Sequence, residues 1–217
     1  MSVASPLAPP AAEPAAEPSV SAPMTEAEYL RIERAATEGL RAEFDGSRRI
    51  PMSGASRRHI ILAKLIERLL DELIAARPAA ERAARKLMTF RSDLRLRVPG
   101  GRYRYPDVLL TPDPPEVLDE EQDTVLNPLL IVEALSPSTE RTDRGIKLAE
   151  YRTIPTLTDY LLVDQSEPLI DHYRRTGGGE SNPGEPDRWE VTTHRGPTAT
   201  VPLAGLGELL WGEAFGG

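Results

Sequence analysis

The sequence contains no cysteine and only three histidines, which are scattered along its 217 residues. Disulfide bonds and thiolate zinc sites are therefore excluded, and three dispersed imidazoles do not form a metal site of their own. A metal ion, if the protein binds one, must be held by oxygen ligands. The sequence also lacks any run of about 18 apolar residues, so no membrane-spanning helix is predicted.

Acidic residues outnumber basic ones, and the formal net charge of -8 argues against a protein that coats nucleic acid through bulk charge. The charges are nevertheless segregated along the chain. Residues 82–104 contain eight basic side chains and one acid, Asp93, whereas residues 113–123 contain six acids and no base. A solvated surface is one interpretation of both runs, and contact of the basic run with a polyanion is the other.

The first 23 residues differ in composition from the rest of the chain. They include six prolines and seven alanines, with Glu13 and Glu17 as the only charged side chains. Such a segment cannot bury enough apolar surface to form a core, so we predict a disordered leader over 1–23 and one folded domain over 24–217. The leader lacks the basic residues of signal and transit peptides, which favours a cytoplasmic protein.

Helices and a strand hairpin are predicted for the first part of the domain. Thr25 is a candidate N-cap for a short helix, and the pair Asp45 and Gly46 favours a hairpin turn. Apolar residues recur at helical spacing over 57–76, which predicts a long amphipathic helix that ends before Pro78.

Strands are predicted for much of the remainder. Residues 86–98 alternate apolar and charged side chains as a half-buried strand does, and a Pro-Gly-Gly turn joins them to a strand over 102–110. The apolar segment 128–135 is too short for a helix and is interpreted as a central strand buried on both faces. Then come a helix through about Arg152, a strand over 159–164 and a hairpin with arms at 169–175 and 188–194. This order predicts an α/β fold with a central mixed β-sheet flanked by helices and a C-terminal β-hairpin.

Two carboxylates fall within strand-like apolar sequence. Asp107 lies in the strand over 102–110, and Glu133 lies inside the most apolar strand of the chain. A buried carboxylate without a partner costs on the order of several kcal/mol, so each needs a hydrogen-bond partner or a cation. On neighbouring strands the two side chains could converge on a hard divalent cation such as magnesium, which needs few protein oxygens. Phosphodiester hydrolysis is the reaction that such a site suits best.

Several segments together resemble a known family. They are the opening MTEAEYL, the helix SRRHIILAKLIERLL, and the segments YPDVLL, PLLIVEALSPST, RTDRGIKLAEY and DYLLVD. From about Met24 to Arg175 the chain resembles the Uma-type putative restriction endonucleases, a family within the PD-(D/E)XK nuclease superfamily. The resemblance implies a restriction endonuclease-like fold and a nuclease function.

The resemblance also implies roles for individual residues. Asp107 matches the aspartate of the Pro-Asp motif and Glu133 matches the glutamate of the E-x-K motif, and both would bind the metal. The backbone carbonyl of Ala134 would assist them. The lysine expected in that strand is missing because position 135 is leucine, and in the family it comes from the following helix, where it matches Lys147. Lys147 would position the attacking water and stabilise charge in the transition state.

Three of the matched residues also have a structural interpretation. Glu43 resembles an early glutamate of the family and is counted with the catalytic residues, but an exposed strand position is the alternative. Lys147 could instead form only an ion pair with Asp143, four residues earlier on its helix. His59 matches a helix histidine of the family and is interpreted as a supporting residue rather than a base.

We expect the protein to be an endonuclease that uses magnesium or manganese to hydrolyse nucleic acid. The predicted nucleic acid is DNA. The arginines of 82–104 lie on strands that lead into Asp107, so we expect them to contact phosphates. A homodimer would suit cleavage of both strands, and no membrane partner is expected. Two alternatives remain open: a non-catalytic module that binds nucleic acid or protein and retains the nuclease fold, and a purely structural ion network of Asp107, Glu133 and Lys147.

Overall fold

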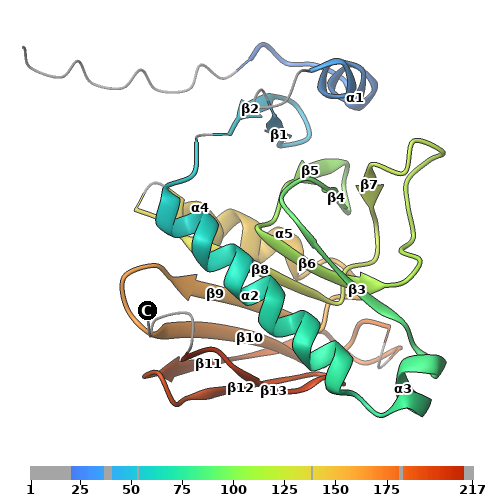
Figure 1. Cartoon of the computed structure of the whole chain (residues 1–217). Coiled ribbons are helices and arrows are strands. Elements are labelled where there is room, and N and C mark those ends of the chain that lie inside the picture. The colour runs from blue at the N-terminus through green and yellow to red at the C-terminus, as the bar shows by residue number, and fades with distance from the viewer. Residues whose placement is uncertain (1–20, 37–40, 53, 138, 181–182, 213–217) are drawn as a thin grey trace, which may run out of the picture.

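The computed structural model describes residues 21–36, 41–52, 54–137, 139–180 and 183–212 (Figure 1). Nearly all of the predicted leader over 1–23 lies outside the described residues, and Ser21, the first of them, exchanges hydrogen bonds with the backbone of Arg49. The described strands form a six-stranded sheet, a five-stranded sheet and a separate pair. No helix in these residues is long and apolar enough to cross a membrane.

The six-stranded sheet carries the centre of the fold. Its strand order is β11-β10-β9-β8-β6-β3, in which β8 and β9 run parallel and the other neighbours run antiparallel. The strands are β3 (Leu87–Arg91), β6 (Val108–Pro112), β8 (Leu130–Leu135), β9 (Asp159–Asp164), β10 (Leu169–Gly177) and β11 (Arg188–Arg195). Every residue of β8 is buried, as expected for a central strand covered on both faces. The predicted mixed sheet is confirmed.

Helices cover both faces of this sheet. On one face lies α2 (Arg57–Ala76), which begins after the N-cap Ser56 and ends before Pro78, as predicted. Its apolar side chains pack against those of β6, β8 and β9. On the other face lies one continuous helical stretch made of α4 (Glu140–Thr142), the π-helical η1 (Asp143–Lys147) and α5 (Leu148–Tyr151). The central strands β6, β8 and β9 thus lie between two helical layers.

The five-stranded sheet packs against the N-terminal helix α1 (Glu26–Ala35). Its order is β2-β1-β5-β4-β7, with β1 (Ala42–Phe44), β2 (Arg49–Pro51), β4 (Arg95–Val98), β5 (Arg102–Arg104) and β7 (Thr124–Val125). The predicted hairpin is β1–β2. Its turn forms because Asp45 accepts hydrogen bonds from the backbone N–H groups of Ser47 and Arg48, and because Gly46 adopts a φ of +97°.

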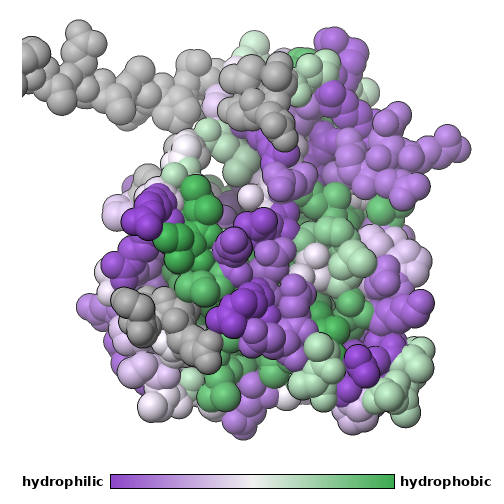
Figure 2. All heavy atoms as spheres, in the orientation of Figure 1, coloured by the Kyte–Doolittle hydropathy of each residue, from purple (hydrophilic) through white to green (hydrophobic). Residues whose placement is uncertain are grey.

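Polar and apolar side chains occupy different parts of the surface. Figure 2 shows hydrophilic side chains gathered over the region of β4, β5 and β7, and an apolar patch over the N-terminal half of α2. The exposed Ile60 and Ile61 belong to that part of α2. The two patches lie beside the region in which the first sheet meets the second.

Two predicted strands are each divided between the sheets. Residues 86–98 form β3 and β4, which belong to different sheets and are separated by a turn at 92–94. Residues 102–110 likewise form β5 and β6. Each pair of strands is close in sequence, so the sequence pattern did not reveal the change of sheet. Pro106 has no N–H to continue a ladder. Asp107 therefore lies immediately before β6 and not within a continuous strand.

The C-terminal region contains the predicted hairpin and one further strand pair. Strands β10 and β11 form the hairpin, paired from Leu169 opposite Arg195 onward. The sequence did not predict the following pair, β12 (Thr200–Leu203) and β13 (Gly207–Leu210), which packs on α2. The short helix α3 (Ala79–Ala84) was also missed, because Pro78 ends α2 and then serves as the N-cap of α3.

Candidate active site

Asp107 and Glu133 lie at one end of the central sheet. The last antiparallel pair between β6 and β8 joins Val108 to Val132, so Asp107 and Glu133 are the next residue on each side. Asp107 Oδ2 accepts a hydrogen bond from the Ala134 N–H (2.7 Å). The site is therefore built where these two strands separate, with the two residues at neighbouring positions of adjacent strands.

Glu133 is almost completely enclosed, with 4% of its side chain exposed. Burial raises the pKa of this carboxyl to about 8, against the opposing effect of the Lys147 ammonium. The negative charge of Asp107 raises the pKa further, which also reflects how close the two carboxylates are.

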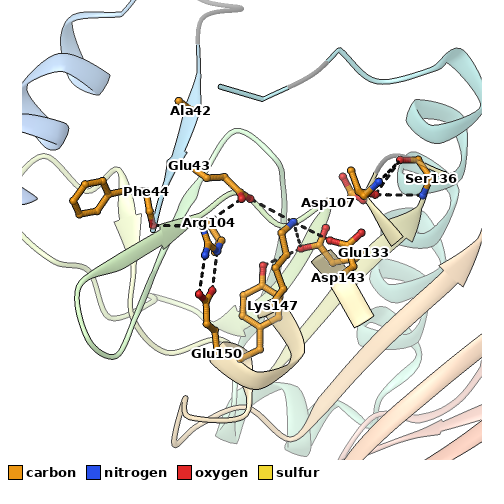
Figure 3. A network of polar contacts seen from close by, with 12 residues as sticks. Ala42, Glu43, Phe44, Arg104, Asp107, Glu133, Ser136, Asp143, Lys147 and Glu150 are labelled. Atoms are coloured by element: carbon orange, nitrogen blue, oxygen red, sulfur yellow. Dashed lines mark hydrogen bonds and ion pairs between the residues drawn. The ribbon is translucent and has the colours of Figure 1, made fainter. Parts of the chain in front are cut away.

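Lys147 reaches the strand end from the opposite helical layer (Figure 3). Its ammonium Nζ lies 3.0 Å from Glu133 Oε1, 3.2 Å from Asp143 Oδ1 and 3.3 Å from Glu43 Oε1. Burial disfavours the charged ammonium, but these three carboxylates outweigh it and raise the pKa of Lys147. The i,i+4 contact with Asp143 is thus present beside the contact with Glu133, so Lys147 does not pair with Asp143 alone.

Glu43 joins the same cluster from the five-stranded sheet. It lies on β1 with 14% of its side chain exposed, so it is not the exposed strand residue of the alternative interpretation. Its second oxygen contacts Arg104 at 3.4 Å, and Arg104 in turn donates two hydrogen bonds of 2.8 Å to Glu150 on α5. Arg104 thus connects the five-stranded sheet to the helical layer that carries Lys147.

Two further buried residues of this cluster were not counted among the candidate site residues. Asp143 lies four residues before Lys147, and Tyr151 lies four residues after it. Asp143 is buried and reaches Lys147, while the Tyr151 hydroxyl donates to Glu133 Oε1 at 2.8 Å. The i,i+4 spacing on both sides of Lys147 is the signal that could have identified them.

His59 supports Asp107 from α2. Its Nε2 lies 2.7 Å from Asp107 Oδ1, and its Nδ1 lies 3.1 Å from the Gln165 side-chain amide. The hydrogen bond to Asp107 raises the pKa of His59, against the effect of partial burial. His59 therefore orients the carboxylate of Asp107, as the sequence suggested.

The basic stretch 82–104 is largely paired with acidic side chains of the protein. Five of its arginines are engaged in ion pairs within the protein: Arg91 with Glu67, Arg95 with Asp123, Arg97 with Glu26, Arg102 with Glu150, and Arg104 with Glu150 and Glu43. The acidic stretch is also partly neutralised, because Arg34 pairs with both Asp119 and Asp123. Contact of these arginines with phosphates stays a prediction, since Arg91 and Arg102 each keep 41% of the side chain exposed.

The site offers carboxylate oxygen atoms as ligands for a divalent cation. Within the described residues, no group of three or more His, Asp or Glu side chains is arranged to hold a metal ion. Magnesium nevertheless needs only one or two protein carboxylates, because water and substrate phosphate complete its shell. Glu133 Oε2 has no hydrogen-bond partner among the described residues, since both of its donors contact Oε1. This free oxygen beside Asp107 fits a hard cation.

Comparison with known proteins places the chain in a family. Residues 26–202 match the Uma2 family, described as "Putative restriction endonuclease". The chain belongs to this family. It is 39% identical over 182 residues to the uncharacterized protein sll1609 of Synechocystis sp. (strain PCC 6803), covering 83% of this chain and 93% of that protein. The uncharacterized protein slr1290 of the same organism is 40% identical over 90 residues, which are 41% of this chain and 46% of that one.

The fold is also found in a solved structure. A crystal structure of a protein from Anabaena variabilis, described as a putative nuclease belonging to DUF820, superposes with a TM-score of 0.65. The match covers 89% of this chain and 98% of the other, at 17% sequence identity. The predicted restriction endonuclease-like fold is thus confirmed, and at this identity the likeness concerns the fold alone.

Proposed function

We propose that the protein is a metal-dependent endonuclease that hydrolyses phosphodiester bonds in DNA. The observation that carries the proposal is the convergence of Asp107, Glu133, Lys147 and Glu43 from four separate elements at one strand end. Membership of a family described as restriction endonucleases supports this activity and supports DNA as the substrate. The oxygen-only donor set supports magnesium or manganese as the cation.

Asp107 and Glu133 would hold the cation, with the backbone carbonyl of Ala134 as a third protein ligand. The free Oε2 of Glu133 is the carboxylate oxygen available for this contact. When bound, the cation supplies the positive charge that polarises the scissile phosphate and lowers the pKa of a water molecule. It would also relieve the charge imbalance of the cluster, where Glu43, Glu133 and Asp143 surround the single ammonium of Lys147 and the charge of Asp107 acts on Glu133.

Lys147 would act as an electrostatic group and not as a base. Because the surrounding carboxylates raise its pKa, the ammonium keeps its proton at neutral pH. Its N–H groups can orient the attacking water and donate to the phosphate oxygens on which negative charge develops. Glu43 holds the ammonium from the side opposite Glu133, so the direction of these donors is fixed before substrate binds.

Cleavage of supercoiled plasmid tests the proposal. Wild type should nick the plasmid in the presence of magnesium or manganese and should be inactive with a chelator, whereas Asp107→Asn should be inactive in both conditions. Asp159→Asn is a matched control, because Asp159 Oδ1 lies 2.7 Å from His172 Nε2 just as Asp107 Oδ1 lies 2.7 Å from His59 Nε2. The control should retain cation-dependent nicking, provided that its melting temperature shows a folded protein at the assay temperature.

The outcomes separate the proposal from its alternatives. An inactive wild type that binds DNA equally well before and after Asp107→Asn would favour a binding module that retains the fold. Activity that persists in Asp107→Asn would show that the nuclease site lies elsewhere. An inactive wild type whose melting temperature does not respond to either cation would favour a structural ion network.

A further inference from the structure

Tyr151 is buried beside the candidate site, and none of the roles described above has been assigned to it. Its side chain is completely buried, and its hydroxyl donates a hydrogen bond of 2.8 Å to Glu133 Oε1. The ring packs edge-on against Tyr160, with the ring centroids 5.2 Å apart. The ring and the hydroxyl therefore have separable functions, since the ring fills the core and the hydroxyl contacts a carboxylate.

Two donors from one helical stretch contact the same oxygen atom. Lys147 Nζ lies 3.0 Å from Glu133 Oε1, and the Tyr151 hydroxyl lies 2.8 Å from it. One turn of helix separates the two residues, so their side chains leave the helix on the same face. The two hydrogen bonds to Oε1 together restrict the χ3 angle of Glu133, the rotation of its carboxylate group. Without such contacts the χ3 angles of glutamate have a broad distribution. The other oxygen, Oε2, then has a defined direction and no hydrogen bond.

We infer that Tyr151 is a positioning residue that turns Oε2 of Glu133 toward the divalent cation. This inference rests on the proposed function, because it requires a cation held by Asp107 and Glu133. Hydrogen bonds from outside the ligand shell commonly orient metal-binding carboxylates, and their removal typically weakens metal binding by about 10–100-fold. Lys147 alone would still contact Oε1, but a single contact leaves the carboxylate free to rotate about that contact.

The test is a titration with manganese in the absence of nucleic acid, with the fraction of free cation measured by electron paramagnetic resonance. Tyr151→Phe keeps the ring and removes only the hydroxyl. Tyr103→Phe is the matched control, because the Tyr103 hydroxyl also donates to a glutamate, Glu26 Oε1, at 2.6 Å. Plasmid nicking is then measured over a range of manganese concentrations for the same proteins.

Tyr151→Phe should bind manganese about tenfold or more weakly than wild type and Tyr103→Phe. Its nicking rate should approach that of wild type as manganese is raised to saturation, because the hydroxyl touches neither substrate nor the reacting atoms. Equal manganese affinity of Tyr151→Phe and wild type would overturn the inference and leave the proposed function standing. A wild type that binds no manganese would overturn both.

Loss of the fold in Tyr151→Phe would also count against a positioning role. The inference predicts that phenylalanine preserves the packing against Tyr160, so the variant should melt cooperatively and show the near-ultraviolet circular dichroism of the folded chain. A variant without a cooperative transition would show that the hydroxyl holds the core together. A nicking rate that stays low at saturating manganese would show instead that Tyr151 acts on the chemical step.

Discussion

Lys147 Nζ lies 3.0 Å from Glu133 Oε1, although 14 residues separate the two in sequence and one stands on a strand and the other on a helix. The contact links the central sheet to the helical layer that covers it. It places the ammonium of Lys147 against a buried carboxylate, while Glu43 and Asp143 contact the same ammonium from other directions.

Replacement of Lys147 by methionine should abolish most of the nuclease activity. Methionine keeps the length of the side chain and removes its charge, so the phosphate oxygens lose a donor. We expect nicking to fall roughly a hundredfold to a thousandfold, in line with the loss of one preorganised charge-stabilising donor. Plasmid nicking at saturating cation measures the effect. The control is Lys64→Met on the exposed face of α2, which should be fully active. Retained activity in Lys147→Met would refute the role given to Lys147.

Asp107→Asn should lower the pKa of His59. The hydrogen bond from His59 to Asp107 is the largest cause of the raised pKa, and an amide cannot stabilise the imidazolium as a carboxylate does. Titration of the histidine side-chain resonances by nuclear magnetic resonance measures the shift. His194, whose pKa is lowered mainly by burial, provides an internal reference that should not move.

The pair of His59 and Asp107 also stabilises the folded protein, and the pH dependence of this contribution has a defined direction. Because the pKa of His59 is higher in the folded protein than its ordinary value, its contribution is full below pH 6.5 and is lost as the pH rises through the folded pKa. The melting temperature of wild type should therefore fall more over that interval than the melting temperature of His59→Gln. Parallel pH profiles for the two proteins would contradict this.

Arg104→Met should destabilise the protein strongly. The guanidinium is buried between Glu150 and Glu43, and removal of one partner from a buried ion pair leaves an uncompensated charge that costs about 3–5 kcal/mol. Chemical denaturation measures the free energy of unfolding. Arg68→Met is the control, since Arg68 and Glu72 form an exposed pair 2.7 Å apart on α2 and such pairs contribute about 0–1 kcal/mol. Equal decreases in the free energy of unfolding of the two variants would show that the ion pairs of Arg104 do not stabilise the fold more than an exposed pair does.

Divalent cation should raise the melting temperature of wild type and not that of Asp107→Asn. A ligand that binds only the folded chain stabilises it by about 2.7 kcal/mol at a hundred times its Kd, which corresponds to roughly 5–10 °C for a chain of this size. Differential scanning calorimetry with magnesium, manganese and calcium measures the effect. Asp159→Asn should keep the cation response, and a response that persists in Asp107→Asn would place the cation elsewhere.

Much of the central sheet and its long helix could be predicted because local patterns determine them. The helix α2 begins after Ser56 and ends before Pro78, and both signals are visible in the sequence. The fully buried β8 appears as a short apolar run. Glu133 stands out because its charge interrupts that run. Asp107 and Lys147 could be named through the family resemblance, and geometry then places them beside Glu133.

The remaining features depend on contacts between distant segments. Whether 86–98 belongs to one sheet or two is decided by the partner strands, of which β7 comes from a loop nearly 30 residues later. The arginines of that stretch look free in sequence, yet Arg97 meets Glu26 and Arg91 meets Glu67 only after folding. Tyr151 resembles an ordinary core residue until its hydroxyl is placed on Glu133.

The π-helical turn of η1 makes the site sensitive to the length of the segment 143–147. In an α-helix each residue advances the helix by about 100°, so deletion of a single residue here would rotate Lys147 relative to the helix that precedes it. Substitution is a milder change, because a Cβ added at Gly145 meets no atom within 4 Å. Insertions and deletions, rather than changes of side chain, are thus the alterations that relatives of this protein should avoid in this turn.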